Sequence, residues 1–473
     1  MFIKDPLDML DNQKTKQNKL RMFISLVAAT QLFACAVPQK NVTEQRTDQL
    51  AEKRHSVSEI QSYQPQDFIW SPASLAGAQS RLELERRQLR ELFSPSATNN
   101  IEDALPAALN AVMLFNIEVD SARAPLLAAL PNLSNKSADY QRQILTAAYA
   151  LYPLESAPLV LNILPQLSTP REFCIATYLV LKAQKNSAST LLEILQKRFP
   201  DEPNEPRLVA LRQTLARKLA PSLSATPPLK DLLAAPFKPG LPVIFSLQRP
   251  GRQHMGLALV RAPDGRFMRD EQGQVFSIPQ LALALNGLPG TITNGNTPQG
   301  VFTIRGAGTA TNPWIGPSPY LHSKLPIEAS VAEFLHQENQ TQEPSQEWSE
   351  AVYQTLVPLS WRPALTEAWL AGQAGRNDIL IHGTTVNPEN YRGASFFPGT
   401  PTAGCLATSE FWSPTDGRLL KSDQLTLAKA FTASGKDMGY LVVAEIDTGT
   451  GEIKLEEVLQ TVLDAEKILL VAP

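Results

Sequence analysis

The segment from Asp378 to Thr408, DILIHGTTVNPENYRGASFFPGTPTAGCLAT, places the strongest constraint on how this chain folds. A short apolar run ends at His382-Gly383, which is typical of a buried strand that carries a histidine at its end. A loop rich in Gly, Pro, Asn and Ser then leads to Gly404-Cys405. If the loop folds back, the imidazole can hold the thiol as the nucleophilic thiolate. The glycine leaves room beside the sulfur for a substrate carbonyl.

A histidine and a cysteine alone would more often be a core histidine and an inert buried thiol. A second motif, Thr297–Ile304 (TPQGVFTI), favours catalysis. With His382-Gly383 and Thr402–Cys405 (TAGC), it resembles the signature of L,D-transpeptidase catalytic domains. That signature is Thr-Pro-x-Gly-x-Phe-x-Ile, then His-Gly, then Ser/Thr-x-Gly-Cys.

The resemblance implies a mostly β catalytic domain over residues 240–447 that modifies peptidoglycan in cell wall biogenesis and cell shape. Cys405 would attack a stem tetrapeptide to form a thioester, with His382 as base. No side chain that orients His382 can be named from sequence, and a backbone carbonyl would serve. Backbone N–H groups at Gly404 and Cys405 are the expected oxyanion donors. The remaining residues expected to position substrate are Gly383, Thr402 and Thr384, although both hydroxyls are equally compatible with capping turns.

The acyl acceptor decides the reaction, and the sequence leaves it open. An amine of another stem peptide gives a 3→3 cross-link, a protein amine gives an anchored protein, and water makes the enzyme an L,D-carboxypeptidase or hydrolase. Family members commonly have His and Arg or Asn at the positions of Ala403 and Ala407. A non-catalytic peptidoglycan-binding module is therefore a further alternative.

The N-terminus resembles a bacterial lipoprotein leader. Basic residues precede an apolar run from Met22 to Ala34, which is too short to span a bilayer but fits a secretory signal. The run ends in Leu-Phe-Ala-Cys, which resembles a lipobox and predicts lipidation of Cys35. Ordinary signal cleavage after Ala36 is the alternative. Either way, we expect an exported cell-envelope protein, and with a lipid anchor one that attaches to the membrane and faces the periplasm.

The remaining segments define the expected domain organisation. Residues 1–36 are the leader, 37–66 a flexible polar tether, 67–220 an α-helical domain, 221–239 a Pro-rich linker and 448–473 a C-terminal extension. A charged helix is expected at 75–93, and Thr169–Glu172 predicts a capping box with proline at the first helical position. The spacing of helix starts loosely indicates HEAT-like helical pairs, which would be a surface for a partner protein. In the extension we expect a helix over 455–463 and an extended segment over 468–471.

A loop-rich segment is expected over 306–347. It carries Trp314, Tyr320 and His322, and the two aromatic residues either pack under the loop or contact substrate. His322 as a second base is the less favoured interpretation.

Composition excludes several functions. A chain of 473 residues needs more than one core, and a net charge of −3 with no basic stripe gives no reason to expect nucleic-acid binding. The three cysteines lie in unlike contexts, so no disulfide framework is expected, and Cys174 reads as a core residue. The five histidines show no metal-ligand spacing, so neither a metal nor another cofactor is expected.

Overall fold

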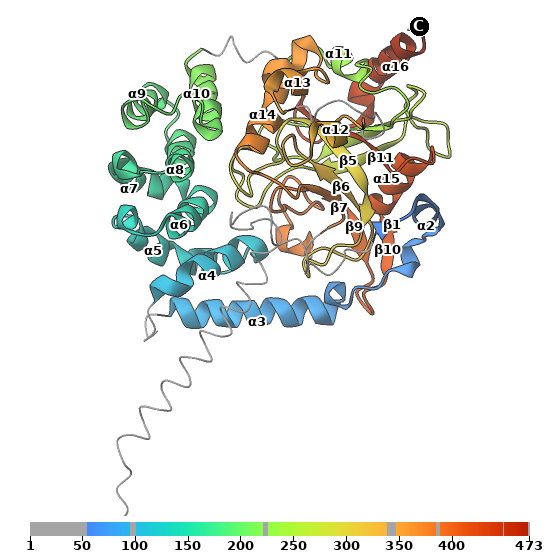
Figure 1. Ribbon diagram of the computed structural model, residues 1–473. Coiled ribbons are helices and arrows are strands. Elements are labelled where there is room, and N and C mark those ends of the chain that lie inside the picture. Colours follow the sequence, from blue (N-terminus) through green and yellow to red (C-terminus); the bar gives the residue numbers. More distant parts are fainter. Residues whose placement is uncertain are drawn as a thin grey trace, which may run out of the picture.

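The computed structural model describes residues 54–94, 101–220, 226–337, 347–384, 388–447 and 449–471. A helical region is followed by a β-rich region, and the two lie side by side (Figure 1). This confirms the expected order of a helical part and a mostly β part. The leader, Cys35 and residues 37–53 lie outside the described residues.

The β-rich region is a closed mixed barrel of eight strands. The order around the barrel is β5-β11-β2-β3-β4-β8-β7-β6, and the pairing of β6 with β5 closes it. Of the pairs of adjacent strands, β11 with β2 and β7 with β8 are parallel, and the others are antiparallel. The strands are β2 Val243–Gln248, β3 Gly256–Arg261, β4 Ser277–Leu281, β5 Gly300–Gly308, β6 Tyr320–Lys324, β7 Leu380–His382, β8 Leu406–Thr408 and β11 Met438–Glu445.

The central strands are apolar on both faces because both faces are covered. Every residue of β2 and of β3 is buried, as expected for strands that lie between a barrel interior and an outer layer of helices. The helices that pack against the hydrophobic core of the barrel are α11 Leu229–Leu233, α12 Val331–Phe334, α13 Glu350–Gln354, α14 Arg362–Gln373 and α16 Leu455–Val471. Helix α15 Asp423–Thr432 contacts β3, β4, β6 and β8, which are strands from different sides of the barrel. A separate ribbon, β9 Glu410–Trp412 with β10 Leu419–Ser422, follows β8.

The helical region is an array with an inner and an outer row of helices. Figure 1 shows α4, α6, α8 and α10 nearest the barrel and α5, α7 and α9 outside them. Successive inner helices contact one another, and α7 and α9 both contact α8. The helices are α3 Leu75–Phe93, α4 Ile101–Phe115, α5 Val119–Ala129, α6 Ala138–Leu151, α7 Pro153–Ile163, α8 Pro170–Ala183, α9 Ala188–Arg198 and α10 Pro206–Leu219. The helix expected at 75–93 is confirmed as α3, and the arrangement agrees with stacked helical pairs.

The start of α8 agrees with the sequence except in its cap. Pro170 occupies the first helical position, but Thr169 makes no side-chain hydrogen bond to the backbone of the helix. Its hydroxyl donates to the Glu172 carboxylate instead. The expected capping box is therefore wrong, because the two side chains satisfy each other.

The helical region holds the loop that joins the two predicted catalytic residues. The Tyr391 hydroxyl donates to the carbonyl of Leu114 at 2.8 Å, and the Asn116 amide donates to the carbonyl of Asn390 at 3.1 Å. Phe396 packs in the same hydrophobic cluster as the inner helices. The conformation of this loop thus depends on contacts with α4 and its C-terminal end.

Three expected boundaries need correction. Residues 54–66 of the predicted tether are folded, since β1 (Arg54–His55) pairs with β5 and α2 (Val57–Ser62) packs on α15. The predicted linker contains α11, because Leu232 and Leu233 reach the barrel core. In the C-terminal extension α16 continues through Val471, so the expected extended segment is helical. Among the helices of the described ranges, none is long and apolar enough to cross a bilayer.

The folded N-terminal segment makes a stability prediction. Ile60 on α2 is fully buried in the barrel core, whereas Ile69 is 55% exposed. We expect Ile60→Ala to lower the free energy of unfolding by about 2–5 kcal/mol, and Ile69→Ala to change it by less than about 0.5 kcal/mol. Urea denaturation of the two variants measures the difference. Equal stabilities would mean that α2 does not belong to the core.

Candidate active site

The parallel pairing of β7 with β8 brings the predicted catalytic residues together. His382, the last residue of β7, lies opposite Ala407, and Ile381 lies opposite Leu406. Cys405 directly precedes β8, and its sulfur lies against the backbone of β7. The loop therefore folds back, as expected, and sets a thiol beside an imidazole.

The Cys405 sulfur has three polar neighbours. The Leu380 N–H donates to Sγ at 3.3 Å, and Sγ lies 3.6 Å from the Asp378 carbonyl, to which a thiol can donate. The third neighbour is His382, which is hydrogen-bonded to Cys405. When the proton leaves, the Leu380 N–H and the imidazolium both favour the resulting thiolate. Sequence reasoning missed the Leu380 donor because a backbone N–H carries no residue signature.

A backbone carbonyl orients His382, as the sequence analysis allowed. Nδ1 lies 2.6 Å from the carbonyl oxygen of Gly383. A carbonyl only accepts, so Nδ1 carries the proton and Nε2 is the nitrogen available to the thiol. Burial lowers the pKa of His382, but the hydrogen bond and charge of Cys405, and the Gly383 carbonyl, outweigh it and leave that pKa raised. The imidazolium is thus favoured next to the sulfur.

A buried carboxylate lies behind Gly383. A Cβ on Gly383 would come 2.1 Å from Cδ of Glu410, so a side chain there would displace this carboxylate. Glu410 is 2% exposed, and the Ser422 hydroxyl donates to its Oε1 at 2.7 Å. Burial raises the pKa of Glu410 to about 7, and the nearby charge of His382 opposes that rise. Glu410 was not singled out from sequence, because nothing in its neighbourhood indicates that it folds under His382.

Hydrogen bonds fix the turn that carries Cys405. Thr402 Oγ1 accepts from the Gly404 N–H at 3.0 Å and donates to the Cys405 carbonyl at 2.8 Å. Thr297, the first residue of the upstream motif, donates to the Gly404 carbonyl at 2.9 Å. The two motifs that are far apart in the sequence therefore meet at Gly404.

The contacts of three residues differ from the roles expected for them. The Gly404 N–H is used by Thr402 and is not an oxyanion donor in this structure, because the turn satisfies it internally. Thr384 donates to the Glu410 carbonyl at 3.4 Å and acts as a structural hydroxyl. The carbonyl of Gly383 accepts a hydrogen bond from His382, so the contact of Gly383 in this structure is with the imidazole and not with a substrate.

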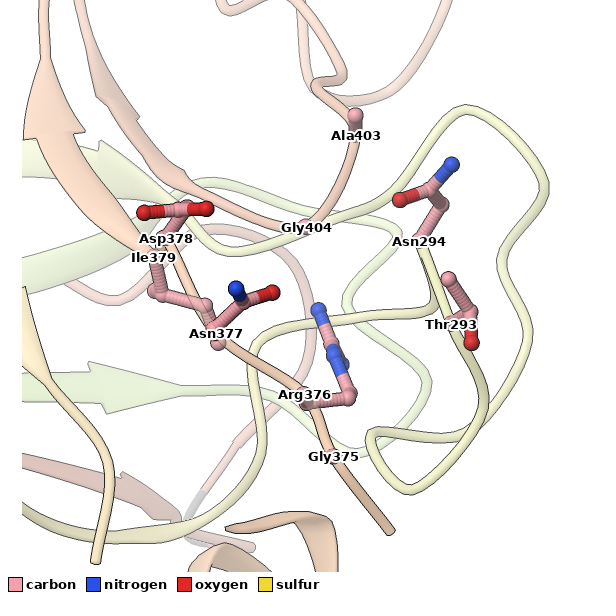
Figure 2. Close-up of a pocket in the computed structure, with 9 residues that line it drawn as sticks. All are labelled: Thr293, Asn294, Gly375, Arg376, Asn377, Asp378, Ile379, Ala403 and Gly404. Carbon is pink, nitrogen blue, oxygen red and sulfur yellow. The ribbon is translucent and has the colours of Figure 1, made fainter. Parts of the chain in front are cut away.

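Arg376 supports the cysteine turn from the other side. Its guanidinium donates to the carbonyls of Gly290, Asn296 and Gly295, the last at 3.0 Å. Gly404 has φ +116°, and a Cβ there would come 2.2 Å from Nη2 of Arg376. Arg376 and Gly404 are among the residues that line a pocket of about 20 Å³. Figure 2 shows Arg376 and Asn294 on one side of it and Asp378 on the other.

A larger pocket, of about 610 Å³, lies between the inner helices and the barrel loops. Its lining includes Tyr149, Lys182, Asn286 and Arg392, whereas neither Cys405 nor His382 lines it. It borders the loop that joins the catalytic pair through Tyr391 and Phe396.

The remaining predicted residues have structural surroundings. Trp314 packs against Phe115 with ring centroids 5.2 Å apart and lies under the Arg81 guanidinium. Tyr320 is fully buried in β6, and Cys174 is a fully buried core residue whose pKa is raised by burial. The 306–347 segment is less loop-rich than expected, since it contributes the end of β5, β6 and α12.

Comparisons were made with protein-family models, curated proteins and solved structures. No match was found in any of the three. The interpretation of the site therefore rests on its motifs and its geometry.

The dyad predicts selective alkylation of one cysteine. We expect iodoacetamide to modify Cys405 and to leave Cys174 unmodified in the folded protein at neutral pH. His382→Ala should slow the modification of Cys405 about tenfold, because an unassisted thiol is only a few per cent thiolate at neutral pH. Peptide mass spectrometry over time measures both sites. Unchanged alkylation in His382→Ala would contradict the thiolate–imidazolium pair.

Proposed function

We propose that this protein is a cell-envelope L,D-transpeptidase that acts on peptidoglycan stem peptides through a Cys405 thioester. One observation carries the proposal: the Cys405 thiol is hydrogen-bonded to His382, while Thr297 of the second motif donates to the Gly404 carbonyl at 2.9 Å. A binding protein has no need of a paired thiol and base. The structure thus supports the resemblance with contacts between the residues that carry it.

The first half of the reaction would form the acyl-enzyme. The Cys405 thiolate attacks the peptide carbonyl before the terminal D-alanine of a tetrapeptide, and an Sγ–C bond forms. The C–N bond then breaks, and Nε2 of His382 gives its proton to the leaving amine. The Gly383 carbonyl keeps the ring in the tautomer that this transfer requires.

The second half would transfer the acyl group. The acceptor amine loses a proton to Nε2 of His382 as it attacks the thioester, and the thiolate is restored. Water in place of the amine gives an L,D-carboxypeptidase or hydrolase with the same intermediate. The buried Glu410 favours the imidazolium in both halves, since its charge interacts with that of His382.

A digest of purified peptidoglycan tests the proposal. We expect the full chain to produce 3→3 dimers or protein–peptide adducts, Cys405→Ala to produce none, and His382→Ala to be slower by about 10²–10⁴-fold. Mass spectrometry identifies the products. Tetrapeptides trimmed to tripeptides without dimers would assign the carboxypeptidase instead.

A carbapenem tests whether Cys405 can be acylated at all, whichever acyl acceptor the enzyme uses. Acylated Cys405 should gain the mass of the drug, and Cys405→Ala should not. No cysteine-dependent product and no adduct would contradict the catalytic proposal and leave peptidoglycan binding as the alternative.

We also propose that the protein is exported and anchored by a lipid on Cys35. The support is the sequence of the leader. We expect metabolic labelling with an alkynyl palmitate analogue to mark the wild-type protein and not Cys35→Ala. An unlabelled protein whose mature N-terminus follows Ala36 would instead establish ordinary signal cleavage, and either result is read from gel fluorescence and N-terminal mass spectrometry.

A further inference from the structure

We propose that His322, Glu328 and Asp378 form a binding site for one divalent transition-metal ion beside the cysteine turn. The three residues come from three segments: His322 from β6, Glu328 from the turn after β6, and Asp378 from the turn before β7. No spacing in the sequence brings them together. The proposal is independent of the proposed transpeptidase reaction.

The sheet register places His322 near the catalytic pair. His322 lies opposite Leu380 in the pairing of β6 with β7. Directly opposed residues share a face of a sheet, and so do residues two apart on one strand. His322 and His382 therefore lie on the same face of the sheet, on adjacent strands.

The three side chains converge closely enough to share an ion. One potential ligand atom from each lies within 4.8 Å of the other two. Bond lengths of about 2.0–2.2 Å to nitrogen and oxygen place neighbouring ligand atoms about 3–4 Å apart, so small side-chain adjustments suffice. All three residues are partly exposed, which leaves a path for an ion. One imidazole and two carboxylates suit Zn²⁺ or Mn²⁺ and lack the thiolates that select softer ions.

The surrounding structure orients the site in advance. Glu328 accepts the Asp378 N–H at 3.0 Å on Oε1 and the Leu325 N–H at 2.8 Å on Oε2. These bonds hold Asp378 at φ +54°, a left-handed conformation that is uncommon outside glycine. Such conformations cost free energy and often occur at binding sites. The Glu328 carboxylate is thus held in place beside the backbone of Asp378.

The site adjoins the nucleophile without including it. The Asp378 carbonyl lies 3.6 Å from Sγ of Cys405, so Asp378 contacts the thiol through its backbone. Figure 2 shows the Asp378 side chain directed away from Arg376. An ion bound by Asp378 would fix the turn on which the sulfur rests.

Metal titration of the full chain tests the proposal. After chelator treatment and dialysis, Mn²⁺ binding is followed by the electron paramagnetic resonance of the free ion, and Zn²⁺ binding by calorimetry. We expect one ion per chain. His322→Ala and Glu328→Gln should each weaken binding at least tenfold, since changes even to outer partners of metal ligands cost about 10–100-fold.

Two further variants locate the ion. Cys405→Ala should bind as the wild type does, because the thiol is not a ligand. Glu333→Gln is the matched control: it removes a neighbouring carboxylate that pairs with Lys324 and is not in the cluster. It should also bind as the wild type does. If Glu328→Gln fails to fold by circular dichroism, Asp378→Asn replaces it as the carboxylate variant.

Three results would overturn the proposal. They are no binding of either ion by the wild type, full binding by both His322→Ala and the carboxylate variant, and loss of binding in Cys405→Ala. The last would place the ion on the Cys405–His382 pair. None of these results bears on whether the peptidoglycan digest succeeds, so the two proposals fail separately.

Discussion

The active-site geometry depends on one pairing, that of β7 with β8. Parallel neighbours cannot be joined by a tight turn, so a long connection must leave one strand and return beside it. In this protein that connection carries the chain from His382 to Cys405, and the helical region holds it through Tyr391 and Leu114. The distance between His382 and Cys405 is therefore set by sheet hydrogen bonds and not by the loop itself.

The residues near Cys405 in the sequence, Ala403 and Ala407, carry no polar side chain. Buried charged residues from other segments lie around Cys405 and His382 instead. Ala407 is buried opposite His382, where a long polar side chain has no room. Charged groups reach the site from elsewhere: Glu410 lies under Gly383, and Arg376 lies beside Gly404. Each of these glycines permits an approach that any Cβ would block. The polar environment of the sulfur is thus assembled from separate segments.

Sequence reasoning predicted what depends on local patterns. The α3 helix, the placement of His382 at a strand end and the burial of Cys174 follow from hydrophobic spacing. Sequence reasoning failed where contacts between residues far apart in the sequence determine the structure. The polar composition of residues 54–66 indicated a tether, yet the buried Ile60 side chain, together with the pairing of β1 with β5, attaches that segment to the barrel. The contact of Glu410 with Gly383 could not be predicted from the sequence either. It depends on how β9, which begins at Glu410, follows β8 in the fold.

The pairing of β1 with β5 also has a consequence for how the chain folds. Arg54 lies opposite Gly308, so strands on either side of the helical region belong to one sheet. The helical array is topologically an insertion in the β-rich unit, attached at both of its ends. β5 also needs β11, near the C-terminus, as its other partner. Because β11 is needed to close it, the barrel cannot close until residues 438–445 have been synthesised. The local helix contacts of the array can form before that.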